Sequence, residues 1–102
     1  MNVGEYGIVY NLNVNFDISG FTSLSLTFTK PDLTTLVVAS PQVTVGSAPV
    51  VTSQGTFAAN QYAVYKFAVG DISLPGTYSA RLTYVDASKR LISDANNFVV
   101  NT

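Results

Sequence analysis

The stretch DISLPGTYSARLTYVD, residues 71–86, decides the fold of this chain. After a Pro-Gly corner, four apolar residues alternate with Ser79, Arg81 and Thr83, and they are Tyr78, Ala80, Leu82 and Tyr84. A period of two predicts a strand that turns one face toward a core. The stretch therefore indicates a fold built from half-buried strands.

The opening Asp-Ile-Ser of this stretch also occurs at residues 17–19, again just before an alternating strand, residues 23–29. In both copies the Asp side chain can cap a turn, and the Ile can close one end of a core before a core strand begins. We interpret both copies as architecture and not as a duplicated functional site.

Tyr78 follows Pro75-Gly76 at the start of the predicted strand. This position is typical of a tyrosine corner, in which the ring is buried and the hydroxyl bonds to nearby backbone at the edge of a β-sandwich. We predict that Tyr78 forms such a structural corner.

The same period of two extends along nearly the whole chain, and no helical stripe of apolar residues occurs. It predicts strands over residues 6–16, 23–29, 33–38, 62–69, 78–84 and 91–100, the last interrupted near 94–97, with short strands on either side of 46–49. Turn residues recur about every 8–12 positions, as in sandwich folds. We predict an all-β fold, an immunoglobulin-like antiparallel β-sandwich of about seven strands, as a single domain over residues 1–102.

Charged residues make up only 11% of the chain, its net charge is −1, and its polarity comes mainly from Ser, Thr and Asn. About 25% charged residues is usual in soluble domains. Such a composition suits a surface partly covered by other subunits, although a compact β domain with small polar outward residues fits it equally well. The charge argues against nucleic-acid binding, and no apolar stretch approaches the roughly 18 residues of a membrane span. The N-terminus lacks the features of a secretory signal, so we expect either folding in a cytoplasm or a leader that is missing from this sequence.

The chain has no His and no Cys, which excludes His-based acid–base catalysis, the Ser-His-Asp triad, and ligation of a metal by imidazole or thiolate. The carboxylates are Glu5 and five Asp residues that all fall in predicted turns: Asp17, Asp32, Asp71, Asp86 and Asp94. We therefore predict no catalytic residue, no cofactor and no metal. Calcium held by Asp17 and Asp71 is chemically reasonable, but turn capping is the favoured role.

Two surfaces are candidate interfaces. One is the polar face of the first strand, formed by Asn11, Asn13 and Asn15. The other contains Tyr62 and Tyr65, which lie on opposite faces of one predicted strand, so at least one ring should point outward. An outward aromatic ring can anchor a subunit interface or stack on a sugar, and an interface is favoured here. Lys89-Arg90 is interpreted as a solvated hairpin tip.

The order of these segments resembles a known family. DISGFTSLSLTFTKPD (17–32), GDISLPGTYSARLTYVD (70–86) and LISDANNFVV (91–100) resemble the small immunoglobulin-like modules of tailed-bacteriophage virion proteins, in particular the N-terminal domain of baseplate upper proteins. Leu33 departs from the family, which usually has Gly there, so the hairpin after Lys30-Pro31-Asp32 is expected to be wider. We also expect a free-standing module, without the receptor-binding or stalk region of a baseplate upper protein after Thr102.

The resemblance implies a non-enzymatic structural protein of a tailed-phage virion, assembled in the host cytoplasm. Such a module would dock on the capsid, as a decoration or cement protein, or on the tail or baseplate. Its partners would be other virion structural proteins, and we expect a homo-oligomer that binds neither nucleic acid nor a membrane. The alternative is a carbohydrate-binding β-sandwich module, separate or at a virion surface, which would use an outward Tyr62 or Tyr65.

Overall fold

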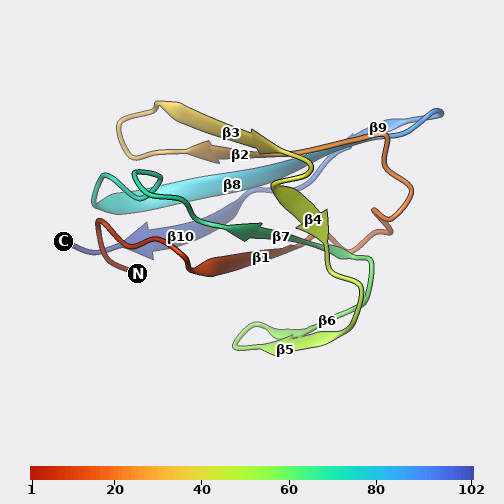
Figure 1. The fold of residues 1–102 in the computed structure, drawn as a ribbon, viewed down its shortest axis with the longest axis horizontal. Helices are drawn as coiled ribbons and strands as arrows, with labels where there is room; N and C mark the ends of the chain where they lie inside the picture. Colours follow the sequence, from red (N-terminus) through yellow and green to blue (C-terminus); the bar gives the residue numbers. More distant parts are fainter.

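Ten short strands and no helix make up the structure, a computed structural model that describes residues 1–102 (Figure 1). The strands are β1 (Val9–Asn13), β2 (Ser23–Thr29), β3 (Thr35–Ala39), β4 (Val43–Val45), β5 (Val50–Thr52), β6 (Gly55–Phe57), β7 (Tyr62–Lys66), β8 (Gly76–Val85), β9 (Arg90–Ile92) and β10 (Asn96–Val100). All pairs of named strands are antiparallel, and the only parallel contact is an isolated bridge between Asn2 and Asn101. The structure contains no helix long and apolar enough to cross a membrane.

The strands form two main sheets and one separate hairpin. The larger sheet has the order β10-β8-β2-β3, and β9 also pairs with β8. The smaller sheet has the order β1-β7-β4, and β5 pairs only with β6, in a hairpin that projects from the body (Figure 1). The predicted all-β antiparallel sandwich is confirmed, and the immunoglobulin-like assignment within that class stays a prediction. The strands number more than seven because residues 43–57 form three of them and the last predicted strand is broken in two.

The core lies between the two sheets and contains the residues that the period of two places inward. Along β2 and β8 every second side chain is buried, and burial of each large apolar one contributes about 1.5–3 kcal/mol. Phe28 lies at the centre of an aromatic cluster, with its ring centroid 5.5–6.2 Å from those of Tyr10, Tyr65, Phe67 and Phe98. The alternation in the sequence predicts a core of nine residues, of which only Phe98 is half-buried. The other eight are buried: Leu24, Leu26, Phe28, Phe67, Tyr78, Ala80, Leu82 and Tyr84.

The first strand is shorter than the sequence pattern predicts, and this part of the prediction is wrong. Tyr6 begins the apolar face of the predicted strand 6–16 but is 63% exposed, and Asn15 lies outside β1. Gly7 and Asn15 have φ values of 77° and 62°. A left-handed residue at each end turns the chain out of the extended conformation, so the alternation continues in the sequence after the strand has ended.

The hairpin between β2 and β3 is tight, which corrects the expected wider turn. Leu33 occupies the position where the family has Gly, and it takes the left-handed conformation itself, with φ at 68° and its side chain 82% exposed. The N–H of Lys30 donates to the Thr34 carbonyl at 2.8 Å and closes the turn. Asp32 Oδ1 accepts hydrogen bonds from the Thr34 N–H and hydroxyl, which also lower the pKa of Asp32.

Candidate functional site

The predicted Asn face is partly covered by the chain itself. Asn11 is half-buried in a pocket beside the β5–β6 hairpin, so it does not lie on an open surface. Asn13 Nδ2 donates to Asn15 Oδ1 at 2.9 Å, so these two side chains bond to each other. The structure therefore places only Asn13 and Asn15 together as a polar surface and separates Asn11 from them.

One tyrosine of the second candidate interface, Tyr62, does point away from the core, but neither ring is exposed, so the expected outward aromatic surface is absent. Tyr62 and Tyr65 are only 7% and 4% exposed. Tyr62 lies on the outer side of β7, but the segment leading to the β5–β6 hairpin covers it: its hydroxyl donates to the Ala48 carbonyl at 2.6 Å and its ring packs on Phe57. Gly46 makes room for the ring, because a Cβ at that position would lie 1.9 Å from Tyr62 Cζ. An exposed aromatic platform for a sugar is thus absent from β7.

Tyr65 points into the core, where its ring lies beside Phe28 and Phe67. Its hydroxyl donates to Asp71 Oδ2, and the same carboxylate oxygen accepts the Ala68 N–H at 2.8 Å. Burial and the Asp71 bond raise the pKa of Tyr65 to about 12. Tyr65 therefore holds the turn before β8 in place and presents nothing to a partner.

Tyr78 is almost completely buried at the start of β8. Its hydroxyl donates to the Leu74 carbonyl at 2.8 Å, and the Leu74 N–H lies 3.1 Å from the same oxygen. The ring stacks on Phe98 with centroids 5.3 Å apart. One side chain thus ties the Pro-Gly corner to the adjacent strand β10, which is the arrangement of a tyrosine corner.

Four of the five Asp side chains cap turns, those of Asp17, Asp32, Asp71 and Asp86, whereas the Asp94 side chain makes no hydrogen bond. Asp17 accepts hydrogen bonds from Ser19, and these bonds lower the pKa of Asp17. Asp86 accepts hydrogen bonds from Ser88 in the same way. The pKa of Asp86 is also lowered, chiefly by the hydrogen bond that the Tyr84 hydroxyl donates. No group of three carboxylates that could hold a metal ion occurs. Asp17 and Asp71 each make their bonds within or beside their own turn. Lys89 and Arg90 are exposed where the Asp86 turn leads into β9.

A free sheet edge at β3 is one feature that the sequence analysis did not identify. β3 pairs with β2 along one side, and no strand pairs with its other side. The strand TLVVA carries no charge, no Pro and no Gly, and Val37 at its centre is 61% exposed. Such an edge is a template for pairing with another chain, and natural proteins usually protect it with charges, prolines or bulges.

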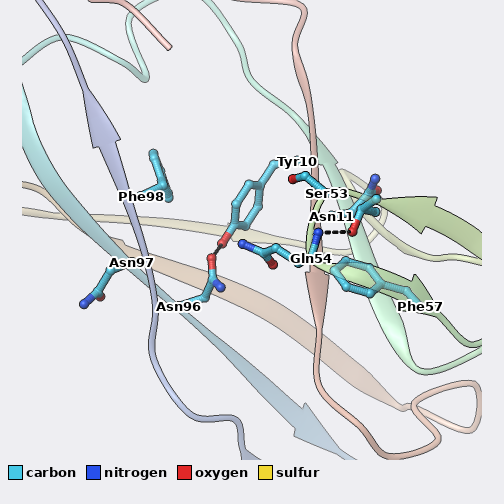
Figure 2. Close-up of a pocket in the computed structure, with 9 residues that line it drawn as sticks. Tyr10, Asn11, Ser53, Gln54, Phe57, Asn96, Asn97 and Phe98 are labelled. Atoms are coloured by element: carbon cyan, nitrogen blue, oxygen red, sulfur yellow. Dashed lines mark hydrogen bonds between the residues drawn. The ribbon is translucent and has the colours of Figure 1, made fainter.

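A small polar pocket is the second such feature. It lies between β1, β10 and the tip of the β5–β6 hairpin, has a volume of about 220 Å³, and is lined by Tyr10, Asn11, Gln54, Asn96 and Asn97 among others. The Tyr10 hydroxyl donates to Asn96 Oδ1 at 2.6 Å across the gap between the two sheets (Figure 2). Burial raises the pKa of Tyr10 well above its usual range, so its hydroxyl stays a neutral donor.

The pocket could not be found from sequence because its walls come from segments about 40 residues apart. The only signal is compositional: an Asn-containing first strand and an Asn-Asn pair before Phe98. Both segments carry carboxamides, but nothing local in the chain says that they face one another. Comparison with protein-family models, with curated proteins and with solved structures finds no match to this chain.

Proposed function

We propose that this chain is a non-enzymatic structural module of a tailed-phage virion, which docks on the capsid or on the tail or baseplate. The resemblance of segments 17–32 and 70–86 to virion modules supports this, as does the low content of charged residues. The observation that carries the proposal is the free, uncharged edge of β3. The occupant of that edge is a second copy of this chain, because a virion presents many identical copies in a symmetric array.

The hydrogen bonds around β3 show which backbone groups point away from β2. Ser40 N–H donates to Leu24 O at 2.9 Å, and Lys30 N–H donates to Thr34 O at 2.8 Å. Hydrogen-bonded positions alternate along an antiparallel pair, so the even residues of β3 face β2 and the odd residues face away. The outward backbone groups belong to Thr35, Val37 and Ala39, except that the Ala39 carbonyl accepts the Gln42 N–H at 2.9 Å.

This arrangement is self-complementary. In an antiparallel pair of two β3 strands centred on Val37, each Val37 donates its N–H to the carbonyl of the other Val37. The Ala39 N–H of each copy then meets the Thr35 carbonyl of the other. A two-fold axis through Val37 therefore joins the larger sheets of two copies into one continuous sheet. The outward side chains along this line are Thr, Val and Ala, so no like charges meet.

Val37→Lys tests the proposal, since a charge at the centre of an edge strand opposes strand addition. Val99→Lys is the matched control: Val99 is 58% exposed on β10, at the opposite side of the same sheet. By light scattering the wild-type chain and V99K should be dimers at micromolar concentrations, whereas V37K should be a folded monomer. Tagged V37K should enter purified phage particles less than V99K does.

Two outcomes contradict the proposal separately. If Asn13→Lys lowers incorporation and V37K does not, the docking surface is the face of Asn13 and Asn15, and the β3 assignment is wrong. If particles lack the wild-type chain altogether, the virion role itself is wrong, whatever the oligomeric state in solution.

A further inference from the structure

The polar pocket beside the β5–β6 hairpin contains side-chain groups that the fold leaves without partners. Four carboxamides line it, those of Asn11, Gln54, Asn96 and Asn97. Within the chain, only Asn96 Oδ1 accepts a side-chain hydrogen bond, from Tyr10. The amide nitrogen of Asn96 and both polar atoms of the other three carboxamides make no bond to the protein. Figure 2 shows Gln54 reaching from the hairpin toward Tyr10 and Asn96, so the amides of Gln54 and Asn96 converge from two sides. Asn11 and Asn97 are the strand neighbours of Tyr10 and Asn96, and their amides point to the opposite faces of β1 and β10.

The chemistry of the lining selects a class of ligand. A carboxamide offers a donor and an acceptor side by side, which matches adjacent hydroxyl groups, because each hydroxyl both donates and accepts. No Lys, Arg, Asp or Glu lines the pocket, so a charged ligand would lose hydration without gaining an ionic partner. The rings of Tyr10 and Phe98, with centroids 5.3 Å apart, add an apolar wall next to the amides.

The anchoring of the pocket is independent of any ligand. Tyr10 is held by its bond to Asn96 and by edge packing on Phe28, with centroids 5.6 Å apart. The hairpin that carries Gln54 closes with a bond from Thr52 Oγ1 to the Gly55 carbonyl at 2.9 Å. The base of the hairpin is attached to β7 by packing of Phe57 on Tyr62, with centroids 6.0 Å apart. Both walls are therefore connected to the body without a ligand, which limits the entropy lost when a ligand is held.

We propose that this pocket binds one ring of a neutral saccharide through the carboxamides of Gln54 and Asn96, beside the ring of Tyr10. The volume of about 220 Å³ is below the roughly 300–1,000 Å³ of ordinary small-molecule sites, so a single sugar ring fills it and the rest of a glycan extends outward. This site is separate from the β3 edge and goes beyond the docking role proposed above. It also differs from a sugar platform on Tyr62 or Tyr65, since both of those rings are buried.

Side-chain amide signals in ¹⁵N-resolved NMR spectra report directly on this pocket. The wild-type chain is titrated with neutral hexoses and N-acetylhexosamines, and with glucuronic acid and glucosamine as negatively and positively charged comparisons. A neutral sugar should shift the NH₂ signals of Gln54 and Asn96, while that of Gln42, an exposed Gln in the β3–β4 turn, stays unchanged. The two charged sugars should bind more weakly than the neutral ones.

Gln54→Ala and Gln42→Ala form the matched pair of variants, because both Gln side chains are exposed in turns outside the core. Gln54→Ala should weaken binding about two- to tenfold, as expected for the loss of one neutral hydrogen bond, and Gln42→Ala should leave it unchanged. Val37→Lys should also bind the sugar normally, which separates this site from the docking edge. The proposal is overturned if no neutral sugar shifts these signals at millimolar concentration, if both charged sugars bind as tightly, or if Gln54→Ala and Gln42→Ala behave alike.

Discussion

Residues 17–24 (DISGFTSL) and 71–78 (DISLPGTY) begin with the same three residues and place the same kinds of side chain inside. Ile18 and Ile72 are both buried, as are the residues at the eighth position, Leu24 and Tyr78. The two segments nevertheless lie at opposite ends of the sandwich, because the strands that follow them are antiparallel neighbours (Figure 1). One local pattern therefore closes both ends of the same core.

The two Asp residues have different roles. Asp17 Oδ1 accepts the N–H and the hydroxyl of Ser19, at 2.8 and 2.6 Å, so it stabilises only its own turn. Asp71 reaches back to the Tyr65 hydroxyl and the Ala68 N–H, and so connects β7 to the turn before β8. At the Asp17 end a different residue makes the equivalent bond, from Tyr84 to Asp86 at 2.7 Å. The Ile of the pattern has a constant role, whereas the tertiary surroundings decide what the Asp binds.

Replacement of the two Ile residues should have the largest effect and tests whether the two ends are equivalent. Ile18→Ala and Ile72→Ala should each lower the free energy of unfolding by about 2–5 kcal/mol, because each leaves a cavity in the core. Urea unfolding followed by circular dichroism measures this. Ile92→Ala is the control, since Ile92 is half exposed and its loss should cost about 0.5 kcal/mol or less. If only one of the two Ile variants lowers the free energy of unfolding, the two ends are not equivalent.

Removal of the two carboxylates should separate the segments. Asp71→Ala leaves the Tyr65 hydroxyl and the Ala68 N–H without their acceptor and should cost about 1–3 kcal/mol. Asp17→Ala should lower the free energy of unfolding clearly less, because Asp17 is exposed and water can accept the Ser19 hydrogen bonds in its place. The same urea experiment compares the two variants. Equal losses would contradict the different roles that the contacts assign to Asp17 and Asp71.

Tyr78→Phe tests the one hydroxyl that the second segment has and the first lacks. It removes the bond to the Leu74 carbonyl while leaving the ring on Phe98, and should cost about 1–2 kcal/mol. Thermal unfolding monitored by circular dichroism measures the change. Leu24, at the matching position, has no hydroxyl to lose, so Leu24→Met is the control and should be better tolerated. A neutral Tyr78→Phe would mean that Tyr78 contributes only its ring.

The smallest expected effect concerns how the Tyr–Asp bonds at the two ends respond to alkali. The pKa of Tyr65 and that of Tyr84 are each raised from 10.0 to about 12, the first chiefly by burial and the second chiefly by the bond to Asp86. The folded chain therefore holds these phenolic protons more tightly than the unfolded chain does. The resulting stabilisation is complete below pH 10 and is lost as the pH rises through 12.

Tyr65→Phe and Tyr84→Phe should each make the stability less dependent on pH between 10 and 12, measured by urea unfolding at a series of pH values. Tyr6→Phe is the control, because Tyr6 is exposed and no hydrogen bond of its hydroxyl occurs in the structure. If both variants follow the wild-type curve, the two Tyr–Asp bonds do not contribute to stability in the way their geometry indicates.

The sequence by itself determined the strands whose two faces differ. β2 and β8 were predictable almost to the residue, because the alternation of apolar and polar side chains is a local property that one core face imposes. The burial of Tyr78 was predictable for the same reason, since it lies near the start of β8. The burial of Ile18 and Ile72 was predictable from the Asp-Ile-Ser pattern that precedes each strand. The first strand was predicted too long because its alternation continues beyond residues whose left-handed φ ends the strand.

Only the tertiary structure decided what covers each outward face and each edge. Tyr62 is buried on the outer side of its sheet because residues 46–57 fold back over it, and no pattern within β7 carries that information. The β3 edge is free because no strand pairs beyond it, and the pocket forms because β1, β10 and the β5–β6 hairpin meet. These are contacts between distant segments, whereas a period of two records only which side of its own strand a residue occupies.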